Sequence, residues 1–355
     1  MLALYGATVG QLGLLRREMT CNQACCAMIV DPEQADFRFL FYQLIAARSF
    51  LKRLATGAAQ QNLSGQLIKS LTLPFPALKE QQAIACILGA LDDKIELNRR
   101  MNRTLEATAR AIFKSWFVDF DPVRAKAAGR QPPGLKPEIA DLFPDSFVDS
   151  ELAEIPKGWK VGMLGEIVHE VRVVVSPSEI EPGTPYIALE HIPRRCIALG
   201  SWGTADGVAS GKLRFRRGDI LFGKLRPYFH KAGPAPVEGV CSTDIVVVRP
   251  SSDYWYGLAV GHMTDDAFVA HTDRGSTGTK MPRTNWHDMA GYKIAVPSAD
   301  VAKVHTNFVR PMLEKMRTTI MESHTIASLR DVLLPELISG ELRVPDADRI
   351  VPRAT

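Results

Sequence analysis

The sequence of 355 residues has no long apolar run, no cluster of cysteines and no strong overall charge. A membrane-spanning helix needs about 20 consecutive apolar residues, so we expect a chain outside the membrane, with the cytoplasm as its default location. The six cysteines are scattered, and Cys21, Cys25 and Cys26 lack the second cluster or nearby histidine that would complete a zinc site. We therefore expect no metal. Because the net charge is only +4, any basic surface must be local.

Catalytic motifs are missing as well. The sequence contains no GxxxxGK[ST] loop for ATP, no HExxH pair and no GxSxG turn. Asp145, Glu154 and Lys157 resemble a nuclease motif, but the last spacing is one residue too long and the segment is rich in proline. We expect no catalytic residue in this chain.

A heptad pattern runs from about residue 80 to residue 117. Apolar residues alternate steps of four and three, with no proline and with Gly89 off the seam. At 1.5 Å per residue such a helix is roughly 55 Å long, which suits a spacer better than a globular core. The residues expected to pair this helix with a partner are Leu88, Leu91, Ile95, Asn98, Asn102, Leu105, Ile112 and Trp116.

A second helical stretch, residues 309–337, repeats the pattern about 220 residues later. Asn98 and Asn102 map onto Thr319 and Ser323, and polar residues within a seam favour one register. An alternative seam through Val309, Leu313, Met316, Ile320, Ser323 and Ala327 fits nearly as well. The residues expected to pair in the first register include Val309, Met316, Ser323, Leu333 and Leu337.

The repeat extends beyond the helices. Residues 2–13 (LALYGATVGQLG) correspond to residues 221–233 (LFGKLRPYFHKAG), and a polar loop containing glycine follows in each copy, at residues 56–62 and 274–280. About 65 residues, 155–220, precede the second copy and have no counterpart before the first. The pattern predicts two globular units, each followed by a long helix, the first of which begins within its own fold. Residues 121–157 between them are rich in proline and predict an extended connector.

Several segments resemble a known family. The run LTLPFPALKEQQAIACILGALDDKIELNRRMNRTLEATARAIFKSWFVDFDPVRAK, followed by GRQPPGL, LFPDSF, DSEL and IPKGW, resembles the central conserved region of type I restriction-modification specificity subunits. YGATVG with CNQA, and residues 221–233, resemble parts of the target recognition domains of that family.

The resemblance implies an α+β fold with two target recognition units in tandem, each followed by a long conserved helix, the two helices forming an antiparallel coiled coil. It implies that the chain binds a bipartite site on double-stranded DNA. The implied protein partners are two modification subunits, which methylate adenine with S-adenosylmethionine, and restriction subunits driven by ATP and Mg²⁺; no cofactor is expected on this chain. The adenine methyltransferase signature is absent, since Asp121-Pro122 is followed by Val123 and Arg124.

The expected boundaries follow from this resemblance. They are residues 1–77 for the C-terminal part of a first target recognition domain, 78–120 for the first long helix, 121–154 for the connector, 155–298 for the second target recognition domain, 299–342 for the second helix and 343–355 for a tail.

Local charge agrees with a nucleic-acid role. Seven cations lie within residues 212–231 beside one acid, Asp219, and residues 37–79 contain six cations and no acid until Glu80. Such clusters neutralise phosphates, while Asn, Gln, Arg and Lys on loops read base edges. The candidate DNA-binding residues are Gln60, Gln61 and Asn62 in the first unit and Lys224, Arg226, Tyr228, Lys231, Arg274, Ser276, Thr277, Thr279, Lys280 and Arg283 in the second.

Two other interpretations compete with this one. A truncated remnant of the family would keep one working half-site. A coiled-coil adaptor protein would use its globular units to bind protein, and salt-sensitive binding of duplex DNA together with a modification subunit would speak against it.

Overall fold

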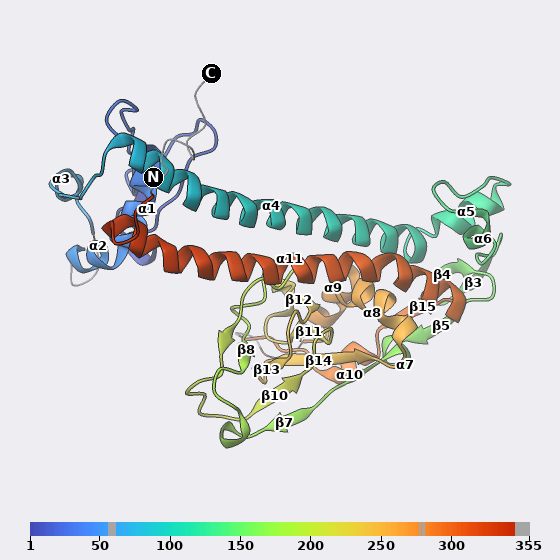
Figure 1. The fold of residues 1–355 in the computed structure, drawn as a ribbon. Helices are drawn as coiled ribbons and strands as arrows, with labels where there is room; N and C mark the ends of the chain where they lie inside the picture. Colours follow the sequence, from blue (N-terminus) through green and yellow to red (C-terminus); the bar gives the residue numbers. More distant parts are fainter. Residues whose placement is uncertain (56–61, 277, 279–280, 345–355) are drawn as a thin grey trace. The chain divides into compact units, whose positions relative to one another are not determined.

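The computed structural model describes residues 1–55, 62–276, 278 and 281–344, and it confirms the α+β fold with two long helices (Figure 1). These helices are α4 (Leu78–Phe117) and α11 (Ala299–Ser339). The chain divides into two compact units, the first formed by Met1–Leu97 with Ser323–Thr355 and the second by Asn98–Glu322. Each unit therefore contains one part of α4 and one part of α11. Among the described residues, no helix has the length and apolar character needed to cross a membrane.

The first unit consists of short elements around a small core that contains Leu2, Leu51 and Leu63. The carboxylate of Asp36 caps α1 by accepting the backbone N–H groups of Arg38 and Phe39 at 2.9 Å. The elements that precede α4 are β1 (Leu2–Ala3), η1 (Gly6–Thr8), β2 (Cys25–Cys26), α1 (Phe37–Ala46), α2 (Arg48–Leu54) and α3 (Gly65–Lys69).

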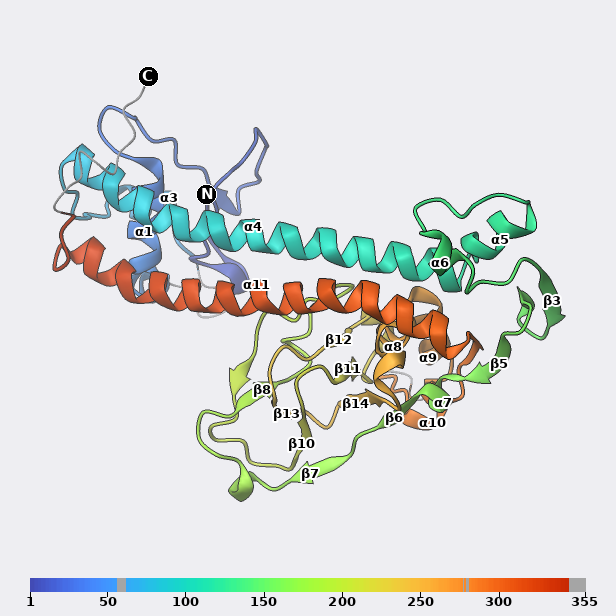
Figure 2. The same ribbon diagram turned by 45° about the vertical axis from the view of Figure 1, so that its right-hand side comes forward.

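Within the first unit, the start of α4 runs antiparallel to the end of α11 (Figures 1 and 2). Leu88 and Leu337 belong to one apolar cluster there. Asp92 links three elements, because its carboxylate accepts the Tyr42 hydroxyl of α1 at 2.7 Å and the Arg330 guanidinium of α11 at 2.6 Å. The contact of Asp92 with Arg330 thus joins the two helices beside an apolar seam.

Within the second unit, polar side chains join the same two helices. The hydroxyl of Thr319 donates to Oδ1 of Asn102 at 2.6 Å, and Nδ2 of Asn98 donates to Oε2 of Glu322 at 2.9 Å. The predicted pairing residues are all buried or half-buried: Leu88, Leu91, Ile95, Asn98, Asn102, Leu105, Ile112, Trp116, Val309, Met316, Ser323, Leu333 and Leu337.

Residues of both candidate seams of the second helix are buried. Val309 and Met316 are common to the two registers, Leu313 and Ile320 come from the alternative one, and Thr319 comes from the first. The buried stripe of α11 is wider than a coiled-coil seam because Val309, Leu313 and Met316 belong to the main apolar core of the second unit.

The second unit contains two principal sheets. One is antiparallel in the order β12-β11-β14-β6, and the other has the order β7-β10-β13-β8-β9 with one parallel pair, β13 with β8. The strands of the first sheet are β6 (Val168–Glu170), β11 (Ile220–Gly223), β12 (Ala232–Pro234) and β14 (Ile245–Pro250). Those of the second sheet are β7 (Val173–Val175), β8 (Pro185–Ile187), β9 (Gly203–Thr204), β10 (Lys212–Phe215) and β13 (Gly239–Cys241).

Short helices and two further strand pairs complete this unit. The strand β5 (Lys160–Met163) pairs with β15 (Lys293–Val296), directly before α11. The helical elements are α7 (Leu164–Ile167), η2 (Pro177–Glu179), η3 (Pro227–Phe229), η4 (Asp253–Trp255), α8 (Tyr256–Met263), α9 (Asp266–Arg274) and α10 (Trp286–Ala290).

The prediction of an extended connector at residues 121–157 is wrong. This segment forms α5 (Asp121–Ala127), α6 (Pro137–Ala140) and a hairpin of β3 (Phe147–Ser150) with β4 (Ala153–Pro156). Prolines at the first turns of α5 and α6 start these helices, because a helix leaves those N–H groups unpaired in any case. Val123 and Phe143 then anchor the segment in the main core.

Two histidines are buried where α4, α8 and α11 of the second unit meet. His262 packs edge-on against Phe113 with ring centroids 4.9 Å apart, and His305 packs edge-on against Phe117 at 4.8 Å. The pKa of each imidazole is lowered to about 3, mainly by burial, with a smaller contribution from His262 in the case of His305. Both rings are therefore neutral in the folded chain at neutral pH.

We expect these histidines to make stability fall as the pH falls. Below the unfolded pKa of 6.5 the unfolded chain takes up protons that the folded chain refuses until about pH 3. Each histidine then removes about 1.4 kcal/mol of unfolding free energy per pH unit. Replacing His305 with Leu removes one such proton, so the unfolding free energy should fall less steeply between pH 6 and pH 4, by about 1.4 kcal/mol per pH unit. Urea unfolding at several pH values measures this slope.

The matched control is His169→Leu, because His169 lies exposed on β6. An equal change of slope in both variants would show that burial of His305 is not the cause.

Candidate nucleic-acid interface

The two units contain the same strand–turn–strand frame at a constant offset of 220 residues. In the first unit Leu2 pairs with Cys26, and in the second Phe222 pairs with Val246. The bridge between Leu2 and Leu12 likewise recurs as the pair Phe222 and Ala232 of β11 and β12. The repeat predicted from the sequence is therefore confirmed at the level of hydrogen-bond register.

The turn inside this frame needs the left-handed backbone region at two positions. In the first unit glycine occupies both, with φ of 79° at Gly6 and 76° at Gly10. In the second unit the equivalent residues are Arg226 and His230, with φ of 52° and 51°. A residue with a Cβ is strained there, and such strain gathers at functional sites. The contacts of the side chains at these two positions are therefore of interest.

The contacts of the His230 side chain within the unit account for a histidine at this left-handed position. Its imidazole is buried, and Nε2 lies 3.0 Å from the carbonyl oxygen of Thr264. Arg110 of α4 donates to the same carbonyl at 2.9 Å. Burial lowers the pKa of His230. This residue fastens the turn to the rest of the unit, whereas Arg226 lies half-buried at the other end of the turn.

A distant segment joins each turn through one isolated bridge. Tyr5 pairs with Asn62 in the first unit, and Leu225 pairs with Arg283 in the second. The flanking hydrogen bonds also match, since Leu63 donates to the carbonyl of Leu4 at 2.7 Å as Thr284 does to that of Lys224 at 3.1 Å. Candidate residues far apart in the sequence, Lys224, Arg226 and Arg283, are thus brought to one edge.

The side chains of this edge differ in their exposure and in their contacts with the rest of the unit. Lys231 donates to the carbonyl oxygen of Leu189, and burial, helped by Arg194, lowers its pKa. Arg283 is 52% exposed and its Nη2 lies 3.2 Å from Oδ1 of Asp244. Tyr228 is 48% exposed. Arg283 and Tyr228 are therefore the more accessible of these groups.

The structure adds two contributors that the sequence analysis missed. The guanidinium of Arg194 lies 3.8 Å from the ring centroid of Phe229, and the guanidinium of Arg226 lies 5.8 Å from the same ring. Phe229 in turn packs edge-on against Tyr228. The Arg194-Arg195 doublet, set between apolar residues, is the signal that could have drawn attention to this segment.

Other candidates lie elsewhere or outside the described residues. Arg274 is exposed at the end of α9, and the Ser276 hydroxyl donates to the carbonyl of Asp273 at 2.6 Å. The candidates Gln60, Gln61, Thr277, Thr279 and Lys280 lie outside the described residues.

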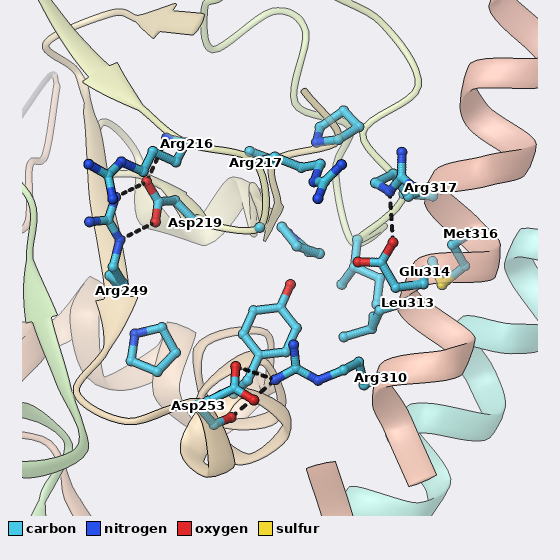
Figure 3. Close-up of a pocket in the computed structure, with 18 of the residues that line it drawn as sticks. Arg216, Arg217, Asp219, Arg249, Asp253, Arg310, Leu313, Glu314, Met316 and Arg317 are labelled. Atoms are coloured by element: carbon cyan, nitrogen blue, oxygen red, sulfur yellow. Dashed lines mark hydrogen bonds and ion pairs between the residues drawn. The ribbon is translucent and has the colours of Figure 1, made fainter. Parts of the chain in front are cut away.

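The basic run at residues 212–231 does not form one surface. Lys212 is buried and donates to both the carbonyl and the hydroxyl of Ser210. Arg216 and Arg217 line a cleft of about 430 Å³ against α11 (Figure 3). Ion pairs occupy the walls of this cleft: Arg249 with Asp219, Arg310 with Asp253, and Arg317 with Glu314.

Comparison with known proteins finds a matching family model and several relatives. The family model described as "Type I restriction modification DNA specificity domain" matches residues 2–107. The type I restriction enzyme MjaIX specificity subunit of Methanocaldococcus jannaschii is 24% identical, over 96% of this chain and 77% of that protein. The HindI specificity subunit of Haemophilus influenzae is 26% identical, over 89% of this chain and 78% of that protein. The chain is related to the type I specificity subunits.

A solved structure agrees at the level of the fold. The crystal structure of the S subunit of a type I restriction-modification system from M. genitalium has a TM-score of 0.57 at 17% identity, covering 95% of this chain and 81% of that one. Within this chain, the specificity-domain match begins at β1 and ends in α4, so it includes the first turn and its bridge at Asn62. The second turn, between β11 and β12, has the same frame but lies outside residues 2–107.

We expect Arg226→Gly to weaken DNA binding with little change in stability. Glycine removes the strain of a positive φ, which offsets the loss of the guanidinium contact with Phe229, so the unfolding free energy should stay within about 1 kcal/mol of the parent value. If Arg226 contacts a phosphate, the slope of log affinity against log salt should drop by about 0.9. Denaturant unfolding and fluorescence anisotropy at several salt concentrations measure the two quantities.

His230→Gly is the matched control, because it places glycine at the other left-handed position but removes buried contacts. It should lower the unfolding free energy by about 1–3 kcal/mol. Equal destabilisation by both variants, with DNA binding unchanged, would assign Arg226 a purely structural role.

Proposed function

We propose that this chain is the DNA sequence-recognition subunit of a type I restriction-modification complex, and that each unit reads one half of a bipartite duplex site. The observation that carries the proposal is the duplicated frame, which presents Asn62 in one unit and Arg283 in the other at equivalent bridges. Two reading edges on one chain suit a target made of two separate halves.

The parts of the chain have distinct roles in this proposal. Residues 1–77 belong to a first target recognition domain and residues 155–298 form a second. The long helices, within residues 78–120 and 299–342, hold the two domains and set the spacing between the halves of the site. Residues 121–154 join the first helix to the second domain as the folded segment described above.

The chemistry of the complex resides on partner subunits. Modification subunits, two per complex, bring S-adenosylmethionine, and restriction subunits bring ATP and Mg²⁺. Within the described residues, no three His, Cys, Asp or Glu side chains converge as a metal site. The chain itself acts by binding and positioning, with no catalytic step of its own.

A groove on α4 supports the docking of a modification subunit. The side chains that line it include the small ones of Thr104, Ala107 and Ala111, and its volume is about 790 Å³. Leu135 and Phe308 also line it, and Phe308 is 39% exposed. Small residues let another helix approach closely, and exposed apolar residues mark a surface that a partner covers.

The first test is the methylation pattern that the complex produces. We expect this chain, co-expressed with its modification subunit in a host without DNA methylation, to direct adenine methylation to one bipartite motif with a fixed gap. Long-read sequencing of the host genome gives the motif directly. Methylation at a single half-site, or none, would contradict two working units.

The second test concerns the groove. Ala111→Arg places a long cation among the small residues that line the groove. It should weaken the docking of the modification subunit by about 1–3 kcal/mol, roughly 5- to 150-fold. Native mass spectrometry of the purified complex should show the loss of one modification subunit.

Ala127→Arg, at an exposed alanine of α5, makes the same change outside the groove and should leave the complex intact. Full assembly of the Ala111 variant would place the docking surface elsewhere.

A further inference from the structure

The two bridge residues, Asn62 and Arg283, differ in a correlated way from unit to unit. The residue beside Arg283 is Asp244, whose backbone carbonyl accepts the N–H of Lys224 at 2.9 Å. The equivalent bond in the first unit joins Leu4 to the carbonyl of Ala24 at 2.8 Å. Unit two thus carries Arg with Asp, where unit one carries Asn with Ala, at two equivalent backbone positions.

The Arg283–Asp244 contact is poorly suited to neutralising phosphates. The carboxylate cancels much of the charge that would attract a phosphate, because its Oδ1 lies 3.2 Å from Nη2 of Arg283. A neighbouring carboxylate orients the guanidinium, and orientation before binding lowers the entropy lost in a bidentate contact with a base edge. Lys224 and Arg226 flank the bridge and can supply the phosphate contacts.

In the first unit the bridge residue is an amide, Asn62, instead of a guanidinium. Asn62 is exposed, and its short amide side chain has few rotamers to lose. No carboxylate is needed to orient it, in keeping with Ala24 at the bracing position. The turn positions equivalent to Lys224 and Arg226 are Leu4 and Gly6, so this edge carries no cation at either position.

We propose that the bridge residue reads one base in each half-site, with Arg283 reading guanine through its O6 and N7 atoms and Asn62 reading adenine through its N6 and N7 atoms. These are the bidentate pairings that major-groove geometry allows for the two side chains. The inference rests on the proposed function and adds to it the chemistry of one position in each half of the target.

The experiment transplants the reading pair between units. In the co-expressed complex, Arg283→Asn combined with Asp244→Ala gives the second unit the pair of the first. We expect one position of one half-site to change from guanine to adenine, with the relative methylation of the two bases shifting by roughly tenfold or more. The other half-site and the gap should stay as in the parent motif.

The reciprocal variant, Asn62→Arg with Ala24→Asp, should change one adenine to guanine in the opposite half-site. Arg283→Lys keeps the charge but loses the planar fork, so it should relax the guanine preference while the salt dependence of DNA binding is retained. This single substitution provides a test that a failure of the double variant to fold would not affect.

Arg214→Asn is the matched control, because Arg214 lies exposed on β10, away from the bridge; the motif should not change. An unchanged motif in both transplants and in Arg283→Lys, or methylation lowered equally at all sites, would overturn the reading role and leave the proposed function standing. A parent complex that gives no bipartite motif would overturn both.

Discussion

Buried polar contacts set the register of α4 against α11 in the second unit: Thr319 donates to Asn102 at 2.6 Å, and Asn98 donates to Glu322 at 2.9 Å. Asn102 is 7% exposed and Thr319 is 1% exposed. Sliding one helix past the other would leave the amide facing apolar side chains, and an unpaired buried polar group costs about 1–3 kcal/mol. An apolar seam alone tolerates slippage more easily. These contacts therefore trade some stability for a single alignment.

The edge formed by Lys224, Arg226 and Arg283 in the second unit is connected to the same pair of helices. Glu106, one turn beyond Asn102 on α4, accepts the N–H of Ile197 at 3.2 Å, and Arg110 donates to the carbonyl of Thr264. Thr264 also holds His230 at the end of the strained turn. A short chain of hydrogen bonds thus leads from the helix seam to the turn, so the edge is held to the helix by directional contacts as well as by apolar packing.

Much of this architecture could be predicted from the sequence. Heptad periodicity located both long helices, and the offset of 220 residues matched the strand register to the residue, because both signals are local or depend on simple repetition. The connector was mispredicted because proline at a helix start looks the same in a sequence as proline in an extended segment. The basic run predicts a cluster that neutralises phosphates, but Lys212 is buried on β10, and Arg216 and Arg217, which lie between β10 and β11, line the cleft. The bridge at Arg283 depends on a tertiary pairing that no local pattern reveals.

The turn and the bridge differ in how freely they can vary over evolutionary time. At Gly6, Gly10, Arg226 and His230 the left-handed backbone restricts which residues are acceptable. Asn62 and Arg283 lie in extended pairing that accepts most side chains. Mutation can therefore explore the bridge while the turn keeps its shape. If the bridge reads a base as proposed, a lineage of such chains could acquire new preferences by substitutions at the bridge and at the residue beside it, with its scaffold inherited almost unaltered.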